Sequence, residues 1–145
     1  MRVFIDADGC PVVGRAVQSA KRAGADCVIV CDASHALQVE GARTVTVLQG
    51  SDSADFTLVN MLSKGDILVT QDYGLAAMSL ARGAVPVNQD GMVYTDRNID
   101  ALLSRRHLAR KIRQAGGRVK GPAKRAAHQD VSFDQSLSRL LGSGG

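Results

Sequence analysis

Four aspartates stand where the chemistry of this chain is expected to lie. Asp6 and Asp8 follow the apolar run VFI, and Asp72 comes two residues after the run ILVT. Asp55 lies near the start of a predicted helix, within GSDSADFTLV. Carboxylates as close as those of Asp6 and Asp8 repel each other, and each raises the pKa of the other unless a positive charge lies between them. A cation, usually a metal ion, is one explanation for such a pair; a phosphorylated aspartate and a plain turn are the others.

These aspartates are expected to meet at one edge of a sheet. In an open parallel sheet, ligands bind at the carboxyl ends of the strands, and side chains that follow several strands come together there. A group of bare carboxylates costs on the order of several kcal/mol in repulsion and lost hydration, which a bound cation offsets. Such oxygen-rich sites suit Mg²⁺ or Mn²⁺, and these ions join carboxylates to phosphate oxygens and position a water molecule.

Each of these residues also has a structural explanation. Asp52 can cap the predicted helix, and Asp55 can stabilise its first turn electrostatically. Asp72 can form a turn or cap the next helix. The strand-end pair of Asp6 and Asp8 fits a ligand site better than a turn, because it follows the first strand directly.

The apolar pattern predicts strands that alternate with helices of ten to fifteen residues. Runs without polar alternation, such as CVIVC, indicate strands that are buried on both faces. The predicted strands are 3–5, 27–31, 44–48, 67–70 and 84–87. The predicted helices run from Pro11 to Gly24, over 51–66, from QDYG to about Ala81, from Asp96 or Asn98 to about Gln114, and over 131–141. In the second of them, Phe56, Leu58, Val59 and Leu62 are expected to form the apolar side, and Gly65 is expected to stop the helix. The fold class is therefore α/β with a mainly parallel central sheet of about five strands.

The last part of the chain differs from the rest. Residues 116–129 are rich in Gly, Ala, Lys and Arg and have no apolar period, which is typical of a mobile basic loop. The next stretch, 131–141, is expected to form a helix that docks back, and the closing GSGG is expected to be disordered. The predicted organisation is one α/β domain, 1–115, followed by a basic extension, 116–145.

Length and composition narrow the class of protein. The 145 residues suffice for one domain with one core. No segment reaches the length of a membrane span, and the acids in MRVFIDADG argue against an export signal. The three cysteines form no Cys-x-x-Cys pair and the three histidines are scattered, which argues against a zinc site and a disulfide framework. We expect a reduced, cytoplasmic protein that does not contact membranes; whether it forms a homo-oligomer stays open.

Charge is distributed unevenly along the chain. Residues 1–100 carry 8 Lys and Arg against 12 Asp and Glu, whereas residues 101–145 carry 10 bases against 2 acids. An acidic body with a basic C-terminal third favours a polyanionic partner for the basic part. A solvated helix face followed by a loose tail is the alternative.

Several motifs, in this order, resemble those of the YaiI/YqxD family of small bacterial proteins. They are IDADGCPV at 5–12, GSDSADFTLV at 50–59, LVTQDYGLAA at 68–77, VNQDGMVYT at 87–95, KGP at 120–122 and HQDVSFDQSL at 128–137. The resemblance covers nearly the whole chain, and the opening motif is the most specific of the six.

That family looks like a branch of the PIN-like superfamily, whose best-studied members are metal-dependent ribonucleases. The resemblance implies a three-layer PIN-like fold and places the superfamily's acids on Asp6, Asp55 and Asp72, with Asp8 and Asp52 as acids added in this branch. Many PIN-like nucleases carry a further acid shortly after the third one, and this chain has none there, which leaves the number of metal ions open.

Together these features predict a metal-dependent nuclease that acts on RNA. The expected ligands of Mg²⁺ or Mn²⁺ are Asp6, Asp8, Asp55 and Asp72. The residues expected to support them are Asp52, Thr70 and Asn88. The ion would activate a water molecule for attack on phosphorus and stabilise the developing charge. The residues expected to hold the RNA backbone are Arg105, Arg106, Arg110, Lys111, Arg113, Lys120, Lys124 and Arg125.

Two other functions remain open. FIDADG also resembles the opening motif of the haloacid dehalogenase superfamily, which implies a phosphatase with Asp6 as nucleophile and Asp8 as general acid. The later paired-acid motif of that superfamily is missing here. In the other alternative, the acidic pocket is retained without catalysis and the protein binds RNA, mostly through phosphates, so that binding is salt-sensitive.

Overall fold

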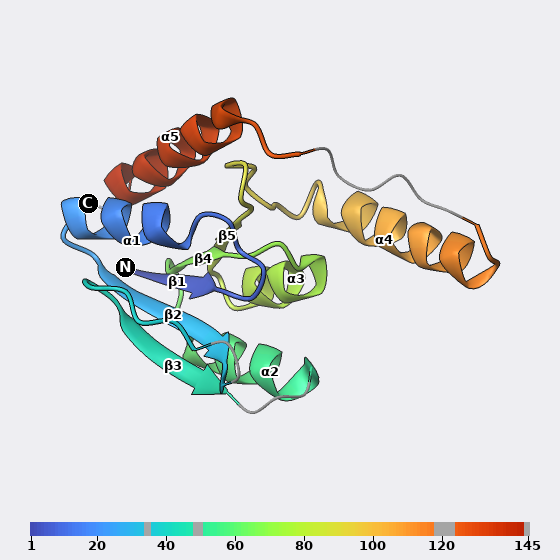
Figure 1. Ribbon diagram of the computed structural model, residues 1–145, viewed down its shortest axis with the longest axis horizontal. Helices are drawn as coiled ribbons and strands as arrows, with labels where there is room; N and C mark the ends of the chain where they lie inside the picture. Colours follow the sequence, from blue (N-terminus) through green and yellow to red (C-terminus); the bar gives the residue numbers. More distant parts are fainter. Residues whose placement is uncertain (34–35, 48–50, 118–123, 144–145) are drawn as a thin grey trace.

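The computed structural model describes residues 1–33, 36–47, 51–117 and 124–143, without the side chains of 51–54 and 143. It contains one five-stranded sheet in which every pairing between strands is parallel (Figure 1). The strand order is β3-β2-β1-β4-β5. The strands are β1 (Arg2–Asp6), β2 (Asp26–Asp32), β3 (Arg43–Val47), β4 (Ile67–Val69) and β5 (Val85–Val87). The predicted α/β class and the parallel sheet are confirmed.

Helices cover both faces of the sheet, so the fold has three layers (Figure 1). Their bounds are α1 (Val13–Arg22), α2 (Ser51–Met61), α3 (Tyr73–Ala81), α4 (Ile99–Gln114) and α5 (Ala127–Ser143). One face packs against α1 and α5, and the other packs against α2 and α3. Strand residues alternate between the two layers: Val3 and Ile5 join the first core cluster, and Phe4 joins the second. The buried, apolar strands follow from this coverage of both faces.

The predicted docking helix is present, and it is longer than expected. Phe133 and Leu137 of α5 are fully buried in the cluster that α1 shares with the sheet. The helix begins at Ala127 rather than Val131, because the Gln129 side chain accepts a hydrogen bond from the Ala126 backbone N–H at 2.6 Å. Residues 127–129 therefore do not belong to the basic loop, and Gly142 does not belong to a disordered tail. The rest of that predicted loop includes 118–123, which lie outside the described residues.

Two predictions about α2 are wrong. The helix ends at Met61 instead of continuing to Gly65, because the chain turns at Ser63, whose N–H donates to the Asp66 carboxylate at 2.8 Å. Phe56 does not join the apolar side of α2: it is 59% exposed, whereas Leu58 and Leu62 are buried. Leu58 lies on the buried face of α2, and Phe56, two residues earlier, lies about 200° around the helix from it, on the opposite side.

The amino-terminal end of the sheet is closed by a charged pair. The Asp66 carboxylate is almost fully buried, and it accepts hydrogen bonds from the Arg2 backbone N–H and the Arg2 guanidinium, both at 2.9 Å. This pair joins the starts of β1 and β4 and satisfies the buried charge. At the opposite, carboxyl end of the sheet, Asp6 has no cationic partner among the described residues, and the side chains that shift its pKa are Thr70 and other acids. That difference directs attention to the carboxyl edge.

Replacing Gly91 by alanine should destabilise the fold more than the same change at Gly65. Both residues have a positive φ, +89° and +88°, where an alanine costs on the order of 1–2 kcal/mol. A Cβ on Gly91 would lie 2.5 Å from the Ser132 backbone oxygen of α5, whereas nothing lies within 4 Å of a Cβ on Gly65. We expect a further loss of roughly 1–3 kcal/mol for Gly91→Ala. Urea unfolding of both variants measures the difference in the free energy of unfolding. Equal losses of stability would show that α5 does not pack closely against the turn at Gly91.

Candidate active site

Thr70 joins two of the predicted site residues at the carboxyl edge of the sheet. Its hydroxyl donates to Asp6 Oδ2 at 2.8 Å and accepts a hydrogen bond from the Asp72 backbone N–H at 3.0 Å. Thr70 is 1% exposed, and its backbone carbonyl accepts a hydrogen bond from the Tyr94 hydroxyl at 3.1 Å. The ends of β1 and β4 are therefore held in a defined relation, as the strand-end aspartates led us to expect.

Asp6 is the most perturbed acid of this edge. Its carboxyl group is largely buried, and this loss of hydration is the main reason why its pKa rises from 3.8 to about 6. The hydrogen bond from Thr70 opposes that shift, whereas the negative charges of Asp55, Asp72 and Asp8 add to it, in that order. Carboxylates from three other positions of the chain are thus close enough to act on Asp6 electrostatically.

The two carboxylate oxygens of Asp72 differ in their contacts. Oδ1 accepts hydrogen bonds from the backbone N–H groups of Gly74 and Leu75, at 2.8 and 3.1 Å, so Asp72 is the N-cap of α3. The same oxygen lies 3.4 Å from Nη1 of Arg106. Among the described residues, Oδ2 has no hydrogen-bond partner. The structural explanation for Asp72 is therefore correct, and it still leaves one oxygen for a ligand.

The other predicted acids lie around this pair. Asp55 is half-buried on α2, and its charge is the largest electrostatic contribution to the raised pKa of Asp6. Asp8 is exposed in the loop after β1. The side chain of Asp52 lies outside the described residues. The loop that carries Asp8 is tied to the end of β4, because Gln71 Nε2 donates to the Gly9 carbonyl at 2.8 Å.

A cavity of about 400 Å³ opens beside Asp8, and it adds a residue that the sequence analysis missed. Asp32 lines it with Ala7, Asp8, Gly9 and Leu37. Asp32 is the last residue of β2, the strand next to β1. The signal was present in the sequence, because Asp32 follows the apolar run CVIVC as directly as Asp6 follows VFI.

The donor atoms fit a metal ion only in part. Asp6 Oδ1 and Asp72 Oδ2 have no hydrogen-bond partner within the described ranges, and carboxylate oxygens are the ligands that Mg²⁺ and Mn²⁺ prefer. However, no three acidic, histidine or cysteine side chains of the described residues lie close enough together to hold a metal ion. Mg²⁺ is commonly bound through one or two carboxylates with substrate phosphates and water completing its shell. The acids fit an ion of that kind and do not form an all-protein cage.

The Asn88 side chain stabilises a turn, and its described contacts do not include the acids at the sheet edge. Its side-chain oxygen accepts hydrogen bonds from the backbone N–H groups of Asp90 and Met92, at 2.9 and 2.8 Å. The turn brings Val93 against β5 in a single antiparallel bridge to Val87. Asn88 thus shapes the chain that leaves β5.

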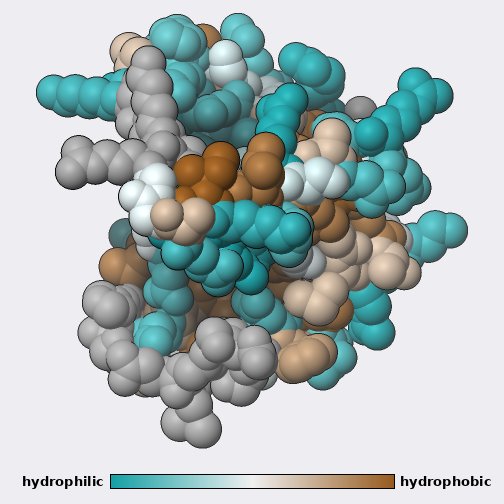
Figure 2. Space-filling view, turned by 90° about the vertical axis from the view of Figure 1, so that its right-hand side faces the viewer, coloured by the Kyte–Doolittle hydropathy of each residue, from teal (hydrophilic) through white to brown (hydrophobic). Residues whose placement is uncertain are grey.

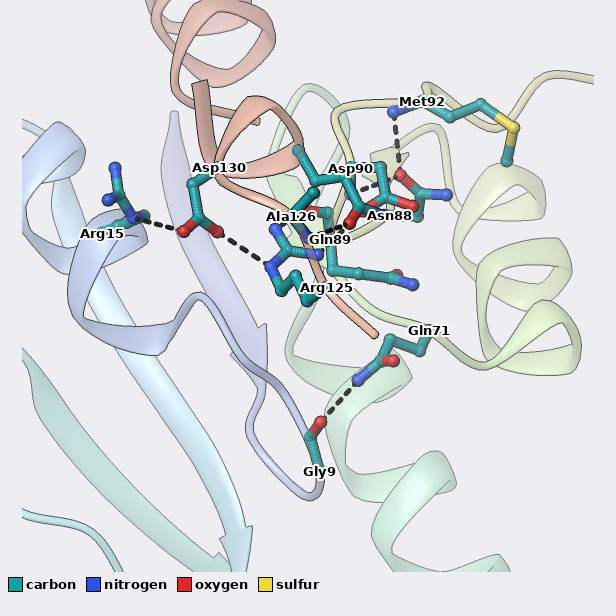
Figure 3. A network of polar contacts seen from close by, with 11 residues as sticks. Gly9, Arg15, Gln71, Asn88, Gln89, Asp90, Met92, Arg125, Ala126 and Asp130 are labelled. Atoms are coloured by element: carbon teal, nitrogen blue, oxygen red, sulfur yellow. Dashed lines mark hydrogen bonds and ion pairs between the residues drawn. The ribbon is translucent and has the colours of Figure 1, made fainter. Parts of the chain in front are cut away.

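Arg125 lies in a polar network and is not a free cation (Figure 3). Its guanidinium donates to the carboxylates of Asp130 and Asp90, both at 2.8 Å, and to the Gln89 carbonyl at 2.7 Å. Arg15 of α1 approaches the second oxygen of Asp130 at 3.6 Å. Arg125 therefore fastens the start of α5 to the turn after β5, a role that its sequence neighbours did not indicate.

The remaining basic residues are placed differently. Five of them are exposed on α4, where Arg106 reaches Asp72: Arg105, Arg106, Arg110, Lys111 and Arg113. Lys124 is exposed before α5, and Lys120 lies outside the described residues. The basic face of α4 thus begins at one of the acids of the sheet edge.

The cysteines offer no nucleophile at this edge. Burial is the main cause that raises the pKa of the Cys10 thiol, so the thiol stays protonated at neutral pH. Cys27 and Cys31 are buried and free.

Among the helices of the described residues, we find none that could span a membrane.

The chain is a three-layer α/β protein with an all-parallel sheet, and several acids lie near the carboxyl ends of its strands. Such sheets bind ligands at this position. A family model described as "Uncharacterized BCR, YaiI/YqxD family" matches residues 4–143. The chain belongs to the YaiI/YqxD family, as its motifs led us to expect.

Curated relatives agree with this assignment. The chain is 51% identical over 141 residues to a UPF0178 protein of Exiguobacterium sibiricum, which covers 97% of this chain and 96% of that protein. It is 45% identical to a UPF0178 protein of Ruminiclostridium cellulolyticum, over 94% of this chain and 90% of the relative. A UPF0178 protein of Enterococcus faecalis is 40% identical, over 97% of both chains. No solved structure matches the chain significantly.

Proposed function

We propose that this protein is a metal-dependent nuclease that cleaves phosphodiester bonds in RNA. One observation carries the proposal. The negative charges of Asp55, Asp72 and Asp8, which come from separate segments, help to raise the pKa of the buried carboxyl group of Asp6. Concentrated negative charge at a strand end is unfavourable unless a cation is bound there. The PIN-like superfamily, whose pattern this sequence resembles, provides the same expectation for Asp6, Asp55 and Asp72.

The acids would hold Mg²⁺ or Mn²⁺ together with phosphate oxygens of the substrate, with Asp6 and Asp72 as the central ligands. When bound, the ion supplies a more acidic water molecule and stabilises negative charge on the phosphate. Thr70 keeps Asp6 in place through its hydroxyl, and the N-cap contacts keep Asp72 in place at the start of α3. Asp8 and Asp55 would orient water around the ion.

The basic face of α4 would bind the RNA itself. Arg106 touches Asp72, so a phosphate at the acidic edge lies within reach of the arginines on this helix. Guanidinium groups suit phosphate because they donate two parallel hydrogen bonds. Lys124 and Lys120 belong to the same proposal from the sequence, whereas the contacts of Arg125 favour a structural role for it.

A second candidate function is RNA binding without catalysis. The observation that favours it is that no three potential ligands among the described residues form a metal site. A phosphatase with Asp6 as nucleophile is supported less well. Its mechanism needs paired acids after a further strand, and β5 is followed by Asn88, whose oxygen is taken up by a turn.

RNA cleavage should require Mg²⁺ or Mn²⁺, and the ion should bind more tightly when RNA is present. The incomplete ligand set explains the second expectation, because phosphate oxygens would complete the shell. End-labelled RNA incubated with either ion or with EDTA tests the first part, and calorimetric titration of Mn²⁺ with and without a cleavage-resistant phosphorothioate RNA tests the second. Binding of RNA without any cleavage in either ion would contradict the nuclease and support the binding protein.

A further inference from the structure

We propose that Arg106, Arg110 and Arg113 form a phosphate-binding stripe that holds the RNA backbone on one side of the phosphate that is cleaved. The inference deepens the proposed function and rests on it. It concerns which residues of α4 contact RNA, and in which direction the RNA strand leaves the acidic edge.

One face of α4 changes its character along the helix. In the first half, this face is apolar: Ile99 is buried, and Leu102 and Leu103 pack against the cluster of Ala76 and Tyr94. In the second half the same face is cationic, because spacings of three and four continue it through the three residues of the stripe, Arg106, Arg110 and Arg113. Beyond the part of α4 that packs against α3, the same face carries a row of arginines. Such a row is suited to bind an anion.

The second half of α4 is exposed, so the three arginines of the stripe are accessible. From Ser104 to Gln114, every residue of the helix except Ala109 is exposed. In Figure 1, this part of α4 projects beyond the sheet and its other helices. The face seen in Figure 2 carries many hydrophilic side chains around smaller hydrophobic areas. A cavity of about 240 Å³ lies on the stripe itself and is lined by Leu103, Arg106, His107 and Arg110.

The stripe begins at the candidate active site. Nη1 of Arg106 lies 3.4 Å from Asp72 Oδ1, and both side chains are about two-fifths exposed, 43% and 40%. A phosphate beside Asp72 can therefore exchange with this carboxylate as the partner of Arg106. Arg110 and Arg113 then follow in one direction, away from the sheet.

The dimensions of the stripe predict how many nucleotides it can hold. With a rise of about 1.5 Å per residue, Arg106 and Arg113 are separated by about 10 Å along the axis of α4. Each guanidinium along this distance can bind one phosphate, so the three arginines correspond to at most three phosphates. The chain has few aromatic residues, 3%, so contacts to phosphates rather than stacking on bases would supply most of the affinity.

Replacing Arg110 by glutamine should weaken RNA binding more than replacing Arg97. Both changes remove one charge from an exposed arginine, and Arg97 lies before the start of α4, at the opposite end of the helix from the stripe. Loss of one phosphate contact lowers the slope of log Kd against log salt by about 0.7 and weakens binding about fivefold near 0.1 M salt. Fluorescence anisotropy with a labelled 12-nucleotide RNA in EDTA measures both quantities. For Arg97→Gln we expect less than a twofold change and an unaltered slope.

Equal losses in the two variants, or no loss in Arg110→Gln, would overturn the stripe, because the position of a positive charge would then not matter for RNA binding. With Mn²⁺ present, the cuts should also stay about three nucleotides from one end of the RNA and not from the other; symmetric cutting would contradict the direction proposed. The binding measurement needs no catalysis. A stripe-dependent affinity without metal-dependent cleavage would therefore refute the nuclease and keep the stripe as an RNA site.

Discussion

Replacing Asp6 by asparagine should reduce metal-dependent RNA cleavage by a factor of at least about 100 and leave RNA binding unchanged. The carboxylate of Asp6 is the acid on which the charges of Asp55, Asp72 and Asp8 converge. Removal of one preorganised group that stabilises transition-state charge commonly costs about 10²–10³ in rate. Binding should survive, because the proposed contacts to phosphates lie on α4 and not on β1.

The fold should tolerate this substitution. An asparagine amide oxygen can still accept the hydrogen bond that Thr70 now donates to Asp6 Oδ2. The shape of the side chain is almost the same, and the buried charge is removed. A loss of cleavage in a protein with unaltered circular dichroism and RNA affinity would therefore report on chemistry rather than on folding.

Asp26→Asn is the matched control for this experiment. Asp26 is exposed at the start of β2, opposite Arg2 in the parallel register, and thus at the end of the sheet remote from Asp6. It removes the same charge and should retain cleavage within a factor of about two. If Asp6→Asn cleaves RNA as fast as the Asp26 control does, Asp6 does not hold the ion and the proposed site is wrong.

Much of the fold follows from local patterns. Strands such as β1 and β2 could be predicted because each is an apolar run between turn residues that is too short for a helix, and burial on both faces explains why the run has no polar alternation. The strand-end position of Asp6 and Asp72 then follows from strand direction alone, since parallel strands place their carboxyl ends at one edge. The link through Thr70 is consistent with the same rule.

Other features depend on contacts between distant residues. The pair of Arg106 and Asp72 joins positions 34 apart, and Arg125 contacts Asp90 across 35 residues. Neither spacing has a local signature, so the basic residues of the last third looked equivalent in the sequence. The structure separates them: Arg125 fastens α5 to the turn after β5, while Arg106 lies beside the acidic edge.

Helix boundaries show a related limit. The side chain that fixes a helix boundary can lie several residues from it. Asp66 accepts a hydrogen bond in the turn after α2, and Gln129, in the first turn of α5, accepts one from the backbone N–H of Ala126. Phe56 was expected on the apolar side of α2 because it is hydrophobic. Its position around the helix places it on the exposed side instead. Asp32 was missed although the strand-end rule applies to it equally.

In the absence of metal ions, Asp6→Asn should be more stable than the parent protein above pH 6 and equally stable near pH 4. Burial raises the pKa of Asp6 from 3.8 to about 6 in the folded protein. Between these values the folded state binds a proton that the unfolded state has released, so the free energy of unfolding falls as pH rises. A shift of about two pH units corresponds to about 3 kcal/mol at neutral pH. Asparagine carries no charge and removes this loss.

Urea unfolding at pH 4, 5, 6 and 7 in EDTA, on the parent and both asparagine variants, measures this effect. The difference in stability between Asp6→Asn and the parent should grow from near zero at pH 4 to about 3 kcal/mol at pH 7, and then level off. The Asp26 variant should show no such growth. A difference in stability that is independent of pH would mean that the charge on Asp6 does not destabilise the folded protein.

Addition of Mn²⁺ and cleavage-resistant RNA at pH 7 should reverse the order of stability. An ion bound by Asp6 and Asp72 stabilises only the folded parent, by RT ln(1 + [L]/Kd). At 100 times Kd this gain is about 2.7 kcal/mol, which nearly cancels the loss due to the buried charge, and at 1,000 times Kd the gain of about 4.1 kcal/mol exceeds it. A parent that stays less stable than Asp6→Asn under saturating ion and RNA would leave the acids of this edge as a repulsive cluster without a cation, and the non-catalytic RNA-binding protein would then be the better account.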